Sequence, residues 1–328
     1  IARNYLHACQ TAQQKKDAGS VYTVKLASGF NGARADFCPA YMGTEAKELY
    51  FTSTRNQALG EDVSGITAMK NGDIFVVRQD ETGKWKAVEK IEGDLNSADD
   101  EGVCSFSADG QTMYLTVCKT DPQYPRMAEI WTSKRSDAKW SKPSALKITG
   151  DTLSSYAHPA VSPDGKWLYF TSDMPGGQGG LDLWRVMIGG DHGMGALENL
   201  GADINTPGDE CFPALRPDGE LYFASSGRDD SMGGLDLYRA REDSASHRWT
   251  VEPLPAPMNS FGDDFGITFE GLHNRGYFSS SRSTGGRGWD KIYEFSYPEV
   301  LQTVKGWVYE QDGYELPAAQ VYMIGDDG

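Results

Sequence analysis

The sequence predicts an all-β fold, a closed five-bladed β-propeller of four-stranded blades, on three observations. A tyrosine-centred apolar run recurs five times along the 328 residues. A turn of the Asp-Gly kind precedes most copies, as in a β-hairpin. A further strand pattern near the N-terminus completes the last copy. One β unit of this size cannot bury its apolar face alone, so the copies have to pack against one another.

The repeat is clearest in the second strand of each copy. Roughly 55 residues separate successive copies, which is typical of propeller repeats. The five strands are centred on Tyr50, Tyr114, Tyr169, Tyr222 and Tyr277. An Asp-Gly turn precedes the tyrosine in the second, third and fourth copies, at residues 108–110, 163–165 and 217–219. The first and fifth copies have other turn sequences.

The remaining strands of the unit follow from the same alignment. A first strand opens with Pro-Ala at residues 39, 159 and 213. A third strand opens with an acidic residue, namely Asp73, Glu129, Asp182, Asp236 and, one place early, Asp290. A fourth strand, often opened by tryptophan, is predicted over residues 85–91, 140–146, 196–200 and 249–254.

The missing fourth strand of the last copy is found at the start of the chain. Val21–Leu26 has the fourth-strand pattern, and we expect it to lie beside Ile292-Tyr293. The link after it also matches the other links, which share an asparagine followed by an acid, at Asn31, Asn96, Asn205 and Asn259. Closure removes exposed strand edges. The sequence therefore predicts a closed ring over residues 20–297.

Two shorter segments flank the predicted ring. Residues 1–17 have helical spacing, with Tyr5, Cys9, Ala12 and Lys16 on one face, and Gly19 is a stop signal. We interpret residues 1–19 as the end of a longer helical segment. Residues 303–328 contain two alternating apolar patterns across an Asp-Gly turn, and we interpret them as the start of a second β domain that continues beyond the sequence.

Composition excludes several functions. The net charge of −16 argues against a nucleic-acid partner, which requires a basic surface. No apolar run approaches the length of about 18 residues that a membrane span needs. The five cysteines form no C-x-x-C pair, so a zinc site is not expected. A Cys104–Cys118 disulfide between neighbouring strands is left open, and no cofactor is expected.

Two stretches resemble known families. Residues 162–170, SPDGKWLYF, resemble the Pro-Asp-Gly repeat of TolB-like, WD-like periplasmic propellers, and the match extends over residues 20–297. The tail VKGWVYEQDGYELPAAQVYM resembles the opening of a carboxypeptidase regulatory-like β sandwich. A helical (TPR-like) segment, a propeller and such a sandwich in this order resemble a group of Bacteroidetes envelope lipoproteins that end in an OmpA-like domain. That group includes a periplasmic component of the type IX secretion machinery.

The resemblance implies a non-enzymatic periplasmic scaffold that binds other envelope or secretion proteins. It also implies a lipid anchor at the outer membrane and peptidoglycan binding, both through parts outside this sequence. None of the family's known ligand contacts falls on a residue of this chain. The first copy lacks the Pro-Asp-Gly turn, which weakens its alignment.

Two sets of repeated acids are candidate site residues. We expect the acids that open the third strands to be structural, accepting hydrogen bonds from backbone amides of the preceding loop. The acids that lead into the first strands are predicted to gather at one mouth of the channel, where they would bind a cation such as calcium or act as acid and base on a sugar. Capping of the repeated link is the simpler interpretation. These residues are Asp99, Asp100, Glu101, Asp209, Glu210, Asp263 and Asp264.

Two loops exceed what the repeat needs, residues 56–71 and 119–127. Such loops are frequent partner-binding sites, so Asp62 and Tyr124 are candidate contacts, with neutral variation in loop length as the alternative. No nucleophile or phosphate-binding motif is present, and the histidines, His158 among them, are scattered over the repeat. We therefore predict a non-enzymatic scaffold. The alternatives are a carbohydrate-active propeller that uses the channel carboxylates, and a sensor propeller that binds calcium or a small ligand.

Overall fold

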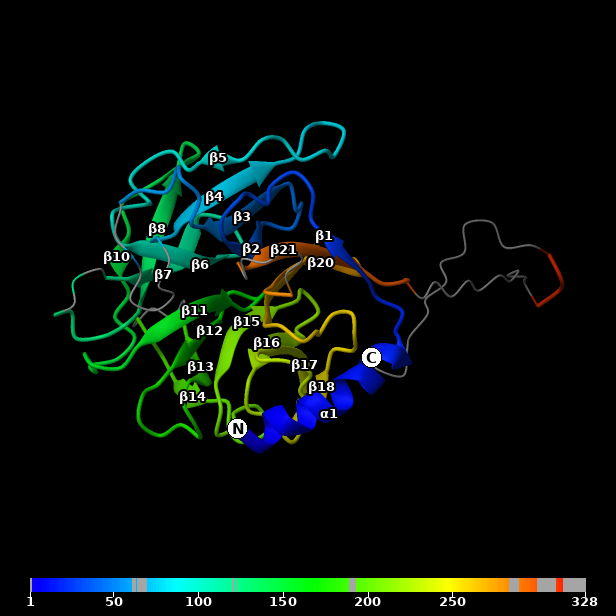
Figure 1. Ribbon diagram of the computed structural model, residues 1–328. Coiled ribbons are helices and arrows are strands. Elements are labelled where there is room, and N and C mark those ends of the chain that lie inside the picture. Colours follow the sequence, from blue (N-terminus) through cyan, green and yellow to red (C-terminus); the bar gives the residue numbers. More distant parts are fainter. Residues whose placement is uncertain are drawn as a thin grey trace. The chain divides into compact units, whose positions relative to one another are not determined.

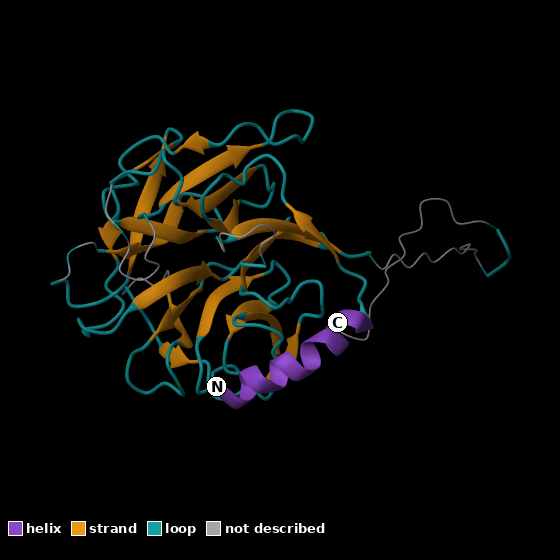
Figure 2. Cartoon of the chain, in the orientation of Figure 1, coloured by secondary structure: helices purple, strands orange, loops and turns teal. Residues whose placement is uncertain are grey.

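The computed structural model describes residues 2–60, 63, 70–119, 121, 123–188, 193–282, 289–299 and 311–314. The chain divides into two compact units, Ile1–Pro298 and Glu299–Gly328. Apart from one helix, the regular structure of the first unit consists of strands (Figure 2). No helix among the described residues is long and apolar enough to cross a membrane. Asp62 and the strands expected after residue 303 lie outside the described residues.

The first unit is a ring of five antiparallel sheets (Figure 1), which confirms the predicted propeller. Blade 1 contains β2 (Asp36–Met42), β3 (Glu48–Ser53), β4 (Asp73–Arg78) and β5 (Glu89–Lys90). Blade 2 contains β6 (Asp100–Phe106), β7 (Thr112–Cys118), β8 (Glu129–Ser136) and β10 (Ser144–Ala145), with β9 (Lys139–Trp140) also on β8. Blade 3 contains β11 (Tyr156–Val161), β12 (Trp167–Ser172), β13 (Asp182–Met187) and β14 (Leu197–Asn199).

Blade 4 contains β15 (Glu210–Leu215), β16 (Leu221–Ser225), β17 (Asp236–Glu242) and β18 (Trp249–Pro253). Blade 5 contains β19 (Asp264–Phe269), β20 (Arg275–Ser280), β21 (Lys291–Ser296) and, as its outer strand, β1 (Thr23–Leu26). The N-terminal strand pairs antiparallel with β21, with Val24 opposite Phe295 and Leu26 opposite Tyr293. The predicted closure of the ring is therefore confirmed.

Most outer strands are shorter than the sequence predicts. The sequence predicts pairing throughout residues 85–91, but β5 is only Glu89–Lys90, and Trp85 makes an isolated bridge to Gln79. An outer strand has a neighbour on one side only, so its ladder ends where packing of its side chains ends.

A bulge interrupts every inner strand at the same place. The residue there has a positive φ in all five blades: Cys38, Val103, His158, Phe212 and Gly266. The bulges surround an apolar cluster of Cys38, Ala224 and Phe265. The rings of His158 and Phe212 stack with centroids 3.8 Å apart. The centre of the ring is therefore narrowed by apolar side chains.

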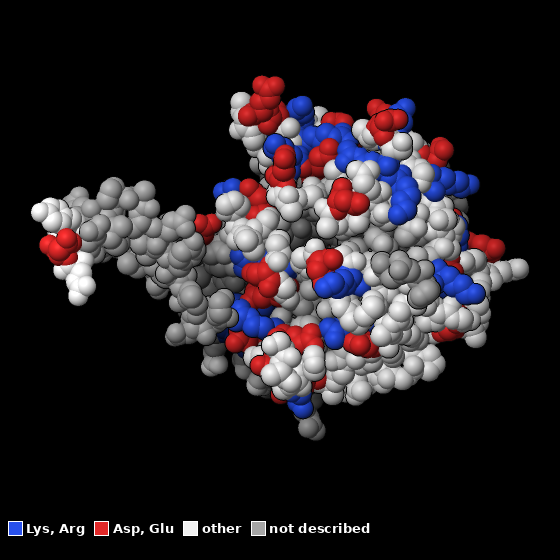
Figure 3. Space-filling view, turned by 180° about the vertical axis from the view of Figure 1, so that it is seen from behind, with Lys and Arg blue, Asp and Glu red and all other residues white. Residues whose placement is uncertain are grey.

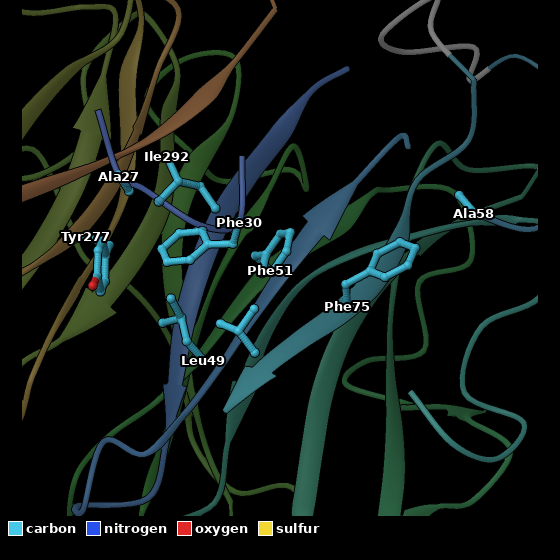
Figure 4. Close-up of a cluster of buried hydrophobic side chains, with 9 residues drawn as sticks. Ala27, Phe30, Leu49, Phe51, Ala58, Phe75, Tyr277 and Ile292 are labelled. Carbon is cyan, nitrogen blue, oxygen red and sulfur yellow. The ribbon is translucent and has the colours of Figure 1, made fainter. Parts of the chain in front are cut away.

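Apolar cores fill the spaces between blades. Between blades 5 and 1, Phe30 packs with Phe51, Tyr277 and Ile292 (Figure 4). Each such core joins side chains from two sheets, which is why one blade would not be stable alone.

The helix α1 (Ala2–Ala18) packs on blade 4 through a stripe that differs from the predicted one. Ala12 of the predicted face is buried, but Ala8 is buried beside it and the predicted Cys9 is exposed. Lys15 anchors the helix, because its ammonium donates to the carbonyl oxygens of Asp230 and Ser231 at 2.5 and 3.0 Å.

The possible disulfide between Cys104 and Cys118 does not form. In the β6–β7 ladder Cys118 lies opposite Asp100, and Cys104 lies opposite Leu115. All five cysteines are free.

Candidate functional site

The link asparagines fasten each link to the blade before it. The Asn205 side chain accepts a hydrogen bond from the Leu183 amide at 2.8 Å and donates to the Leu183 carbonyl at 3.0 Å. The same pair of bonds recurs between Asn31 and Ile292, Asn96 and Ile74, and Asn259 and Leu237. One amide side chain thereby gives a buried strand amide its acceptor and adds a donor to the carbonyl of the same residue, which in blades 3, 4 and 5 also accepts a backbone amide.

The second acid of each repeated pair closes its own link. Glu210 accepts hydrogen bonds from the Thr206 amide and hydroxyl, both at 2.7 Å, and from the Ser225 hydroxyl at 2.6 Å. Glu101 accepts from the amide and hydroxyl of Ser97. Asp264 does the same with Ser260. All three carboxylates are buried, and each therefore fixes the turn that leads into its inner strand.

The first acid of each pair instead reaches the preceding blade. Asp209 accepts the Leu181 amide at 2.9 Å, and Asp263 accepts the Leu235 amide at 2.9 Å. Asp100 accepts the Gly72 amide at 2.8 Å. Asp99, the extra acid of blade 2, forms an ion pair with Lys119 at 2.6 Å. The acids predicted at the channel mouth thus lie on equivalent link positions, and each has protein partners.

A repeated arginine completes these links, and the sequence argument did not include it. Arg282 donates to Asp264 at 2.5 Å and to the carbonyls of Pro257 and Met258, and its guanidinium lies 5.0 Å from the Phe278 ring. Arg55 binds Asp36 and the Phe30 carbonyl in the same way. The available signal was a Ser-x-Arg pattern after the second strand, in blades 1 and 5.

The acids that open the third strands are predicted to accept hydrogen bonds from backbone amides of the preceding loop. Three of them do so. Asp182 accepts the amides of Gln178 and Gly179. Asp236 accepts those of Met232 and Gly233 at 2.6 and 3.0 Å, and Asp73 accepts one from Leu59. In blade 2 no backbone amide among the described loop residues donates to Glu129, which accepts from the side chains of Tyr124 and Trp131.

Burial raises the pKa of several of these carboxyl groups. It raises the pKa of Glu101 to about 7 and that of Asp236 to about 7. It raises the pKa of Asp290 to about 6, with the nearby Asp263 adding to the shift. Burial raises the pKa of Asp264 too, although Arg282 opposes the shift. Burial therefore favours the protonated form of these carboxyl groups.

The link carboxylates already accept hydrogen bonds from the protein, which leaves few of their oxygens to bind a cation or a substrate. Among the described residues, no group of three or more His, Cys, Asp or Glu side chains is placed to hold a metal ion. Cation binding and acid–base catalysis by Asp100, Glu101, Asp209, Glu210, Asp263 and Asp264 remain predictions. The geometry that is present is that of a structural link.

The described ends of the two long loops lie on one face of blades 1 and 2, because both loops join the end of a second strand to the start of a third. Within the described part of these loops and the following link, Leu59, Val63, Met127 and Leu153 are between 44% and 71% exposed. Tyr124 is only partly exposed, and its hydroxyl donates to Glu129 at 2.7 Å. On the face seen in Figure 3, acidic and basic side chains are interspersed.

Comparisons with known proteins give a fold-level likeness. No protein-family model matches the chain. No curated protein sequence matches it either.

Solved structures of β-propeller proteins do match. TolB from Acinetobacter baumannii is 22% identical, with 80% of this chain and 54% of that chain covered and a TM-score of 0.41. A putative TolB from Agrobacterium tumefaciens is 17% identical, with 76% and 71% covered and a TM-score of 0.43. An endo-arabinase from Bacteroides thetaiotaomicron is 15% identical, with 88% and 99% covered and a TM-score of 0.46. The chain thus spans about half the length of the first of these proteins.

Proposed function

We propose that this chain is a non-enzymatic, protein-binding propeller of a bacterial envelope complex. The observation that carries the proposal is the exposure of apolar side chains on the two long loops, at Leu59, Val63 and Met127, and on the link into blade 3, at Leu153. Exposed apolar side chains on loops that exceed what the fold needs are a feature of protein-binding surfaces. The carboxylates of the neighbouring links support the proposal, since each binds a partner inside the protein.

The finer form of the proposal rests on the resemblance of the sequence. We infer a periplasmic scaffold of the type IX secretion system, similar to its component PorE. In this proposal a lipid anchor and a peptidoglycan-binding domain outside this chain attach the complex to the envelope, and the propeller binds another secretion component.

Site-specific photo-crosslinking in cells tests the docking face. A photo-reactive residue replaces Met127 in one strain and Leu197 in a control strain. Both side chains are exposed, but Leu197 belongs to β14 on the outer edge of blade 3. We expect a secretion-system protein to be crosslinked from position 127 and not from position 197.

Charge substitution gives a second readout. The Leu59→Glu, Met127→Glu double variant should lose the crosslinked partner while its melting temperature stays within the scatter of the parent protein. Equal crosslinking from positions 127 and 197, or full retention of the partner by the double variant, would refute this docking face.

A further inference from the structure

Two seams between blades share one aromatic arrangement but differ in what covers it. At the seam of blades 1 and 2, here called the closed seam, the rings of Tyr50 and Phe106 lie 4.9 Å apart, and the Trp140 N–H donates to the Tyr50 hydroxyl at 3.4 Å. At the seam of blades 5 and 1, the open seam, Tyr277, Tyr41 and Trp85 occupy the same positions. The Trp85 N–H donates to the Tyr277 hydroxyl at 2.9 Å.

An arginine covers the closed seam. The Arg135 guanidinium lies 5.8 Å from the Trp140 ring and contacts Met42 and Glu48 at 3.1 and 3.4 Å. As a result Trp140 is only 2% exposed.

Gln79 is the counterpart of Arg135 at the open seam. Gln79 pairs with Trp85 as Arg135 pairs with Trp140. The Gln79 amide donates to Lys47 as the Arg135 amide donates to Gln111, both at 2.9 Å. Glutamine is shorter and uncharged, and Trp85 stays partly exposed. A pocket of about 320 Å³ results, lined by Tyr41, Gln79, Trp85 and Tyr277.

The tyrosine hydroxyls differ between the seams as well. At the closed seam Tyr50 donates its proton to Glu48 at 2.9 Å. The residue in the place of Glu48 is Arg275 at the open seam, which is a donor. Tyr277 lies at one edge of the apolar cluster (Figure 4) and is only 8% exposed. Its hydroxyl accepts from Trp85, and no described residue accepts its proton. A ligand oxygen in the pocket would satisfy this buried donor.

The charged side chains around the open seam neutralise one another. Arg275 forms two hydrogen bonds to Glu270, at 2.7 and 2.6 Å, and Glu294 pairs with Lys25 at 3.2 Å. The pocket therefore has no net charge that would select an ion. Its rim is preorganised, since Asp80 accepts the amides of Thr82 and Lys84 in the turn next to the pocket.

We propose that the open seam binds one saccharide ring. The C–H face of a sugar carries a small positive charge and packs on aromatic faces, here those of Tyr41 and Trp85. Sugar hydroxyls both donate and accept hydrogen bonds. They therefore match the Tyr277 hydroxyl, which has a proton to donate, and the side-chain amide of Gln79, which can donate and accept. The volume is at the lower end of ligand pockets and suits a single ring. The site lies at the opposite end of β2 from the link acids, so it is independent of the proposed docking face.

Saturation-transfer NMR and calorimetry on the full chain test the proposal, with glucose, galactose, mannose and N-acetylglucosamine at millimolar concentration as probes. We expect at least one sugar to bind. Gln79→Arg reproduces the closed seam and should abolish binding. Tyr277→Phe keeps the ring but removes the hydroxyl that would donate to the sugar, and it should weaken binding roughly fivefold. Tyr50→Phe at the closed seam is the matched control and should leave binding unchanged.

Three results would overturn the site: binding of none of the four sugars, unchanged binding in Gln79→Arg, or tighter binding of choline than of any sugar. Thermal unfolding of each variant shows that it is folded. If Gln79→Arg does not fold, Tyr277→Phe decides the question, since unchanged affinity in that variant would also refute the site.

Discussion

The links that lead into blades 4 and 3 occupy equivalent places in the repeat but are held by different chemistry. The link into blade 4 has a buried asparagine, Asn205, and a buried carboxylate, Glu210. At the same places the link into blade 3 has Asp151, which caps the Leu153 amide at 2.8 Å, and Tyr156, whose hydroxyl is 2.7 Å from that of Thr149.

An arginine side chain nevertheless donates hydrogen bonds to the backbone carbonyls of each of these links. Arg228 of blade 4 donates to the link carbonyls of Asp203 and Ile204, each at 2.8 Å. In blade 3 the position that holds Arg55 in blade 1 and Arg282 in blade 5 is Met174, which packs on Tyr156. Arg126 of the preceding blade instead reaches the carbonyls of Asp151 and Thr152, at 2.7 and 3.2 Å. The comparison teaches that the ring requires each link to be fixed, but the side chain that fixes it can come from either neighbouring blade.

The largest loss of stability is expected when Arg282 of blade 5 is replaced by methionine, the residue at the same position in blade 3. Arg282→Met leaves the buried Asp264 carboxylate without its cation, which should cost about 3–5 kcal/mol in the free energy of unfolding. Denaturant unfolding measures this loss. Adding Asp264→Asn removes the buried charge and should recover part of it. A single variant within about 1 kcal/mol of the parent would contradict this account.

A smaller loss is expected at the asparagine. Asn205→Ala leaves the buried Leu183 amide without its acceptor, whereas the Leu183 carbonyl keeps the Leu200 amide, so the cost should be about 1–3 kcal/mol. Asp151→Ala, at the same place before blade 3, removes only the cap of its own turn and should cost less. Equal losses in the two variants, measured by chemical denaturation, would show that the links into blades 4 and 3 are not held differently.

The buried acids should also make stability depend on pH. The pKa values of Glu101 and Asp236 are raised to about 7, and those of Asp73 and Asp290 to about 6. The folded protein therefore holds more protons than the unfolded chain between about pH 4 and 7, so stability falls as the pH rises through this range. His158, whose pKa is lowered to about 3 by burial, acts in the opposite direction, but four acids outweigh it.

Thermal melts from pH 5 to pH 8 measure this dependence, because this range includes the raised pKa values and extends beyond them. The melting temperature should decrease toward pH 8, and Asp236→Asn should flatten the decrease, because asparagine does not titrate. A melting temperature that rises over this range would contradict the assignment of the shifts.

The smallest effect is expected at the first acids of the links. In Asp209→Asn and Asp263→Asn the side-chain carbonyl can still accept the amides of Leu181 and Leu235, so unfolding free energies should change by no more than about 0.5 kcal/mol. The same variants test the enzymatic alternative. Turnover of arabinan, xylan or peptidoglycan fragments by the parent protein that is lost in either variant would favour a carbohydrate-active propeller.

The repeat made much of the fold predictable. Tyrosines aligned at near-constant spacing give the number of blades, and the pattern of Val21–Leu26 gives the closure that the β1–β21 ladder confirms. The outer strands were less predictable. Their length depends on packing at an edge with one neighbour, as the short β5 shows.

For the candidate site, the sequence could predict where the link acids stand in the repeat but not what they contact. The alignment placed the acids of the links correctly, but it did not show that Asp209 binds Leu181 of the preceding blade. Arg126 and Arg228 act alike from different repeat positions, so no alignment column reveals them. The open seam depends on which residue stands opposite Trp85, and that register becomes known only when the strands are paired.

The closing ladder also sets how the ring responds to force. Thr23 lies opposite Ser296 in the β1–β21 pair, so the segments that precede and follow the propeller leave it at one end of the same ladder. Tension between those segments would load the hydrogen bonds one after another, as in peeling, rather than all together in shear. The β1–β21 ladder that closes the ring is therefore also where pulling would begin to open it.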